Sequence, residues 1–118
     1  MLDKVLKAGL LFDFYGALLT EKQQQCMEMH YSHDLSLSEI ADEFGVSRQA
    51  VYDILKRAEQ TLSEYEAKLK LVERHQREQH TIKQVYDSVD ALPASLKTMP
   101  ELQSVMKQLA SIMKAREV

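Results

Sequence analysis

The chain has 118 residues, a net charge of −3 and a single cysteine. This length is within the range of one domain, and no apolar run approaches the ~20 residues that span a bilayer, so we expect no membrane insertion. Glycine and proline are scarce and tryptophan is absent, which favours an all-α protein. Cys26 has no internal disulfide partner, which is typical of a cytoplasmic protein.

The first two helices are predicted from apolar spacing and from one capping pattern. Apolar residues recur at helical intervals over residues 3–19. Thr20 followed by Gln23 matches a capping box, in which each side chain accepts from the other residue's backbone amide, and predicts a helix over residues 21–31. The buried side of the first helix is expected to comprise Val5, Leu6, Leu10, Leu11, Phe14, Tyr15 and Leu18.

The stretch from Ser36 onward predicts a short helix with a sharp end. Ser36 and Glu39 form a second capping-box pattern. Gly45 follows the last apolar residue and can adopt the positive φ that ends a helix abruptly. The apolar stripe of this helix consists of Leu37, Ile40, Ala41 and Phe44.

A second helix is predicted to begin directly after this corner. Val46 is placed to pack in the turn, and Ser47 can cap the new helix. Val51 and Ile54 are spaced to hold it against the first helix. A helix, a tight turn and a helix in this order form a helix-turn-helix motif, which typically places its second helix in a nucleic-acid groove.

The remainder of the chain is predicted to be helical as well. The second motif helix is expected to run on, or to restart after a short break, through residues 59–89. Residues 73–81 contain no apolar side chain and predict a solvated helix or a loop. We expect a C-terminal helical hairpin in residues 73–118, packed on a domain of residues 1–72 or on a second copy of the chain. Ahead of residue 73, the apolar stripe expected on the continued motif helix includes Leu55, Leu62, Tyr65, Leu69 and Val72.

The outward face of the second motif helix is the candidate nucleic-acid site. Arg48 and Gln49 have base-reading chemistry, whereas Lys56 and Arg57 can hold phosphates and Tyr52 can stack or bind phosphate. An ordinary solvated face or a protein-binding surface is the alternative. The candidate residues are Ser47, Arg48, Gln49, Tyr52, Lys56 and Arg57.

The charge distribution bears on the choice of partner. Residues 1–65 carry six basic and eleven acidic residues, whereas residues 66–118 carry nine basic and seven acidic ones. Duplex binding is driven largely by cations that displace phosphate counterions, so an acidic motif half is poorly suited to it. A basic protein partner is therefore an alternative to DNA or RNA.

Two segments, FDFYGALLTEKQQQCMEMHY and SLSEIADEFGVSRQAVYDILKRAEQTL, resemble the YlxM family over roughly residues 5–71. These are small helical proteins encoded beside the GTPase of the signal recognition particle. The resemblance implies a regulatory part in that pathway, with the particle's RNA or its GTPase as partner.

A wider resemblance, over residues 19–62, is to region 4 of bacterial sigma factors, which reads the promoter −35 element. Arg48 matches the sigma pattern. Ala50, Tyr52 and Asp53 stand where sigma factors commonly present arginine, arginine and glutamine. These departures argue against direct −35 recognition.

Catalytic and metal chemistry have little support in the sequence. It contains no nucleophile elbow, glycine-rich phosphate loop or HExxH motif, so we expect a binding protein and not an enzyme. Cys26, His30 and His33 have spacings that metal ligands use, but a structural zinc site needs four ligands and no fourth is evident. We expect no cofactor and no metal.

Overall fold

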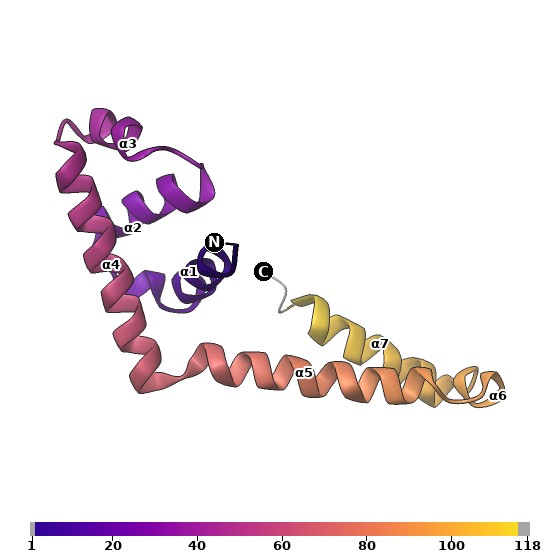
Figure 1. Cartoon of the computed structure of the whole chain (residues 1–118). Coiled ribbons are helices and arrows are strands. Elements are labelled where there is room, and N and C mark those ends of the chain that lie inside the picture. The colour runs from indigo at the N-terminus through magenta and orange to yellow at the C-terminus, as the bar shows by residue number, and fades with distance from the viewer. Residues whose placement is uncertain (1, 116–118) are drawn as a thin grey trace. The chain divides into compact units, whose positions relative to one another are not determined.

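The computed structural model describes residues 2–115, and the side chains of residues 5–114. All regular structure in this range is helical, which confirms the all-α fold (Figure 1). The chain divides into two compact units, residues 1–72 and 73–118. The helices are α1 (Leu2–Tyr15), α2 (Glu21–Met27), α3 (Leu37–Phe44), α4 (Arg48–Leu69), α5 (Leu71–Asp90), α6 (Ala94–Lys97) and α7 (Pro100–Ala115), with a 3₁₀ turn at Gly16–Leu18 and a π-helical turn at Glu28–Ser32.

Helix α2 begins as its sequence predicts. The Gln23 amide donates to Thr20 Oγ1 at 3.2 Å, and the Thr20 amide donates to Gln23 Oε1 at 3.1 Å. The helix continues into the π-helical turn and ends at Ser32, so His33 lies beyond it. The capping box therefore sets the start of α2, and the helical stretch ends within one residue of the predicted end.

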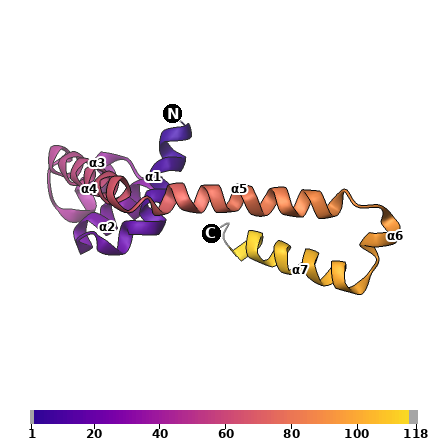
Figure 2. The same cartoon turned by 90° about the horizontal axis from the view of Figure 1, so that it is seen from below.

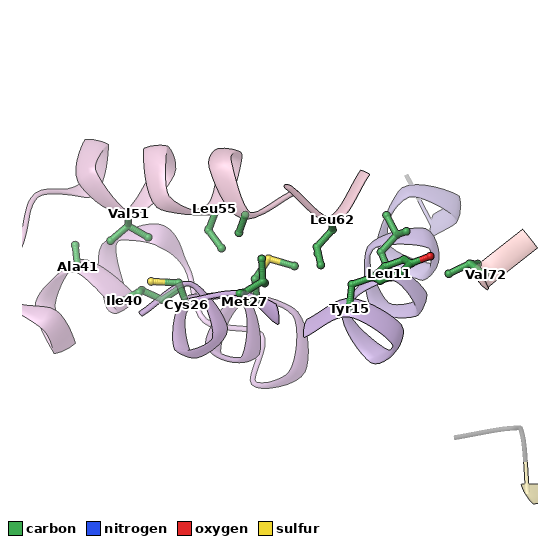
Figure 3. Close-up of a cluster of buried hydrophobic side chains, with 12 residues drawn as sticks. Leu11, Tyr15, Cys26, Met27, Ile40, Ala41, Val51, Leu55, Leu62 and Val72 are labelled. Atoms are coloured by element: carbon green, nitrogen blue, oxygen red, sulfur yellow. The ribbon is translucent and has the colours of Figure 1, made fainter. Parts of the chain in front are cut away.

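Helix α4 forms the spine of the first unit, where it contacts α1, α2 and α3. Val51 and Leu62 are completely buried, and they face Cys26 and Met27 of α2 across the core (Figure 3). Since Cys26 is also completely buried, it serves as a small apolar core residue.

The predicted buried side of α1 is only partly correct. Leu11 and Tyr15 are buried, together with Ala8 and Leu19. Apolar residues occupy most of the circumference of α1, whereas packing on one side of a single unit covers only one stripe of a helix. The helix also ends at Tyr15 instead of residue 19. The prediction was wrong for Val5, Leu6, Phe14 and Leu18, which are between 36% and 58% exposed.

A hydrogen-bonded junction separates α4 from α5. The Tyr15 hydroxyl of α1 donates to Glu66 Oε1 at 2.6 Å and accepts from the Leu71 amide at 3.0 Å. Glu66 Oε1 also accepts from the Val72 amide at 3.0 Å. These two side chains satisfy amides at the start of α5 that have no partner within the helix.

The backbone at this junction turns through Lys70, which has a left-handed φ of 53°. The long helix therefore restarts after a one-residue break, which is one of the two predicted outcomes. Leu69 belongs to the predicted apolar stripe, but it is 52% exposed at the end of α4. Beyond the break, Val72 occupies the core instead.

The second unit is a helical hairpin, in which α7 runs back along α5 (Figures 1 and 2). The polar stretch of residues 73–81 is helical. Every described side chain in residues 73–114 is at least partly exposed. The large apolar side chains with the greatest exposure in this unit are Val85, Leu96, Met99, Val105 and Ile112.

Candidate nucleic-acid interface

The candidate interface depends on how α3 begins and ends. The Glu39 amide donates to Ser36 Oγ and the Ser36 amide donates to Glu39 Oε1, both at 3.1 Å, so the predicted capping box is present. At the other end Gly45 has a φ of +66°, which lies in the left-handed region. The Val46 amide donates to the carbonyl of Ala41 at 3.1 Å, and the chain then turns sharply out of the helix.

Helix α4 is capped and anchored immediately after this corner. Ser47 Oγ accepts from the Ala50 amide at 3.0 Å, as predicted. Val51 is completely buried and Ile54 packs partly buried against the core. Because the inward face is fixed by these contacts, the orientation of the outward face is fixed as well, and the helix-turn-helix geometry is confirmed.

All candidate binding residues lie at the surface. They are the N-cap residue Ser47 and residues of the first three turns of α4, whose opposite face is buried. None of them contributes to the core. The exposed set is Ser47, Arg48, Gln49, Tyr52, Lys56 and Arg57.

The structure brings three of these residues together around a hollow. Arg48, Gln49 and Tyr52 line it with Leu37 of α3, and its volume is about 530 Å³. The Lys56 ammonium lies 5.8 Å from the centroid of the Tyr52 ring, next to this group. The sequence assigned Leu37 to the core stripe and missed its place at the hollow, because spacing along one helix does not show where a second helix crosses it.

The remaining candidates have separate surroundings. The hydroxyl of Ser47 is engaged at the helix cap, and Arg57 does not line the hollow. Gln49 Nε2 donates to Asp53 Oδ1 at 3.1 Å. A bidentate contact from Gln49 to adenine requires its amide group to donate to the base, so the amide must leave Asp53 to make this contact.

Acidic residues of the two motif helices are exposed as well. Asp42 and Glu43 are exposed near the end of α3, and Asp53 is exposed on α4. Such carboxylates repel phosphate at short range. These carboxylates therefore weaken the attraction between the basic residues of the interface and phosphate.

The interior of the first unit contains the titratable groups with raised pKa values. Burial raises the pKa of Tyr15, and its hydrogen bond to Glu66 adds to the effect. Burial also raises the pKa of the Cys26 thiol. The Tyr31 hydroxyl donates to Glu59, and burial together with that carboxylate raises the pKa of Tyr31.

Two further observations concern metals and membranes. Within residues 2–115, no group of three or more His, Cys, Asp or Glu side chains is arranged to hold a metal ion. His30 Nδ1 lies 3.1 Å from the carbonyl oxygen of Leu35, and His33 is exposed. In the same range, none of the helices has the length and apolar character needed to cross a bilayer.

Comparison with known proteins agrees with the motif. The family described as "UPF0122: Putative helix-turn-helix protein, YlxM / p13 like" matches residues 2–108. A UPF0122 protein of Halalkalibacterium halodurans is 49% identical over 105 residues, which cover 89% of this chain and 96% of that protein. A UPF0122 protein of Shouchella clausii is 61% identical over 74 residues, which cover 63% of this chain and 68% of that protein.

Proposed function

Since the chain belongs to the UPF0122 family of YlxM/p13-like proteins, we propose that it is a regulatory protein that binds nucleic acid through the exposed face of α4. The observation that carries the proposal is the capped corner at Gly45, which holds Arg48 and its neighbours outward. In proteins with this motif, the N-terminal residues of the second helix contact base edges. The protein acts by binding and not by catalysis.

The residues of this face have different roles in the proposal. Arg48 and Gln49 contact base edges, where guanidinium and amide groups give discrimination. Lys56 and Arg57 contact phosphates, which set the position of the protein without reading sequence. Ser47 lies at the N-terminus of α4, where backbone amides bind a phosphate.

Salt dependence provides a quantitative test. The face has three cations, namely Arg48, Lys56 and Arg57. Each neutralised duplex phosphate contributes about −0.9 to the slope of log affinity against log salt concentration, so three contacts predict a slope of about −3. This slope is shallow for a DNA-binding protein, which agrees with the acidic balance of residues 1–65.

The experiment is a titration of labelled duplex DNA and of signal recognition particle RNA at several salt concentrations. Arg48→Ala should cost about 1–3 kcal/mol of binding free energy if Arg48 contacts a base. The matched control is Arg74→Ala, because Arg74 already pairs with Glu78 at 3.0 Å in the second unit. Binding that ignores both salt and Arg48→Ala would refute recognition through this face.

The acidic surface supports a second candidate function. Asp42 and Glu43 are exposed, and the first 65 residues have a net charge of −5. Such a surface complements a basic protein, and the family resemblance points to the GTPase of the signal recognition particle. Retention of the purified GTPase by this chain, abolished by charge reversal at these two residues but not by Arg48→Ala, would favour protein docking.

The C-terminal hairpin supports a proposal about self-association. None of its described side chains is fully buried, and large apolar ones such as Val105 and Ile112 are 39% and 41% exposed. A two-helix unit of this size does not bury enough apolar surface to be stable alone. We expect it to pack on residues 1–72 or on a second copy. Sedimentation at micromolar concentration separates these cases, since a monomer would exclude the dimer.

A further inference from the structure

The hollow beside the corner of the motif has a lining suited to a planar group. Leu37, Arg48, Gln49 and Tyr52 form its walls, and its volume of about 530 Å³ falls in the range of ligand sites. Two separate helices contribute, and the corner at Gly45 fixes them relative to each other. The hollow is therefore a consequence of the motif's packing.

The chemistry of the lining is mixed in a specific way. Leu37 supplies an apolar surface, and Tyr52, a residue that is 45% exposed, supplies an aromatic ring. Arg48 and Gln49 place a guanidinium and an amide beside these apolar groups. A nucleobase has the complementary combination, namely a flat aromatic face and an edge that carries hydrogen-bond donors and acceptors.

The exposed ring favours an unpaired base over a paired one. In a duplex the faces of the bases are stacked on one another and only their edges reach a protein. An aromatic side chain stacks on a base only where that base is unstacked, as in loops, bulges and single strands. The Tyr52 ring would thus contribute little to reading a continuous duplex.

The local charge points in the same direction. Duplex binding depends on many phosphate contacts, whereas this face offers three cations among exposed carboxylates. Stacking of an unpaired base on an aromatic ring is worth about 1–3 kcal/mol and needs no added cation. The Lys56 ammonium lies over one face of the Tyr52 ring, 5.8 Å from its centroid, so a base must stack on the other face or displace this ammonium.

We infer that this hollow receives one unpaired nucleobase, which stacks on Tyr52 while Arg48 and Gln49 contact its edge. The inference rests on the proposed binding of nucleic acid through α4. The unpaired base could come from an RNA loop or from a single-stranded segment of DNA, and both present the same aromatic face.

The test compares three labelled probes by fluorescence anisotropy with the full-length chain. They are an RNA hairpin with an unpaired loop, an RNA duplex of equal nucleotide count with no unpaired base, and a DNA hairpin with the same loop sequence. We expect either hairpin to bind about 5–150-fold more tightly than the duplex, since this is the range that stacking of one base supplies. The hairpin that binds more tightly identifies the source of the base.

Two variants of Tyr52 separate stacking from folding. Tyr52→Leu should lose about 5–150-fold in hairpin affinity and much less in duplex affinity, whereas Tyr52→Phe keeps the ring and should retain most of the hairpin affinity. Because Tyr52 lies outside the core, both should retain the wild-type thermal transition. Quenching of 2-aminopurine placed in the loop, present with Tyr52→Phe and lost with Tyr52→Leu, would report the stacked base directly.

The outcomes distinguish this inference from the proposed function. Equal affinity for hairpins and duplex, with both reduced by Arg48→Ala, would overturn the base-stacking hollow and leave recognition by α4 standing. An unchanged hairpin affinity in Tyr52→Leu would overturn the hollow in the same way. Absence of binding to all three probes would overturn both.

Discussion

The corner at Gly45 can be tested by a substitution that raises or lowers the free energy of unfolding according to the backbone conformation at that position. Gly45 has a φ of +66°, and a Cβ added there would meet no atom within 4 Å. The cost of Gly45→Ala therefore arises from the backbone alone. A left-handed alanine costs about 1–2 kcal/mol, and the reduced entropy of the unfolded chain offsets about 0.4–1 kcal/mol. We expect a net loss of about 1 kcal/mol in the free energy of unfolding.

Gly9 provides a matched control. It lies within α1, and a Cβ added there would also meet no atom within 4 Å. Since its backbone is helical, Gly9→Ala should stabilise the chain by about 0.5–1 kcal/mol. Two chemically identical substitutions, both in open space, should thus change stability in opposite directions and differ by about 1.5–2 kcal/mol.

The assay is urea unfolding followed by near-ultraviolet circular dichroism of the tyrosines. Four of the five tyrosines lie in residues 1–72, so the signal mainly reports the unit that contains both glycines. Gly45→Asn should cost less than Gly45→Ala, because asparagine tolerates the left-handed region. If Gly45→Ala stabilised the chain as Gly9→Ala does, the corner would be continuous helix and the outward placement of Arg48 would lose its basis.

The junction at Tyr15, the cap at Ser47 and the raised pKa of Tyr31 can each be tested by substitution. Tyr15→Phe removes the hydroxyl that joins α1, α4 and α5, and should lower the free energy of unfolding by about 1–3 kcal/mol, which a urea titration measures; no loss would mean that the junction is not formed in solution. Ser47→Asp should keep the cap and the thermal transition but weaken nucleic-acid binding, because it places a carboxylate near the phosphates, whereas Ser47→Ala should lose about 1 kcal/mol of stability. The folded chain raises the pKa values of Cys26 and Tyr31, whereas the unfolded chain releases their protons at the ordinary pKa values of 9.0 and 10.0. Because the unfolded chain then binds fewer protons than the folded chain, the free energy of unfolding should fall as pH rises above these values. Tyr31→Phe should make that fall shallower above pH 10.0, and an equally steep fall in this variant would contradict the assignment.

The sequence predicted local structure best where one residue and its near neighbours decide how a helix begins or ends. The cap at Ser36, the positive φ at Gly45 and the cap at Ser47 depend on neighbours within three or four residues, and all three are present. Burial along α1 was predicted poorly, because Phe14 and Leu11 look alike in hydropathy and only the packing of other helices decides which is covered.

The hollow could not be predicted for a related reason. It combines Leu37 of α3 with residues of α4 that come more than ten positions later in the chain. Their proximity depends on the crossing of two helices, which the glycine corner makes tight but whose direction the spacing of apolar residues does not specify. The hydrogen bond from Gln49 to Asp53 is different, because a pair four residues apart on one helix is visible in the sequence.

The double role of α4 connects the fold with the proposed function. Val51 and Leu55 bury one side of the helix, and Tyr52 and Lys56 lie one residue further along on the exposed side. A helix held by core residues on every turn cannot rotate to bring other side chains forward without exposing apolar surface, which costs about 25 cal/mol for each Å². The partner must therefore match the face as it stands, with few cations, one exposed aromatic ring and carboxylates nearby. A long, regular phosphate backbone is a poor match for that face, whereas a single unstacked base beside one or two phosphates is a good one.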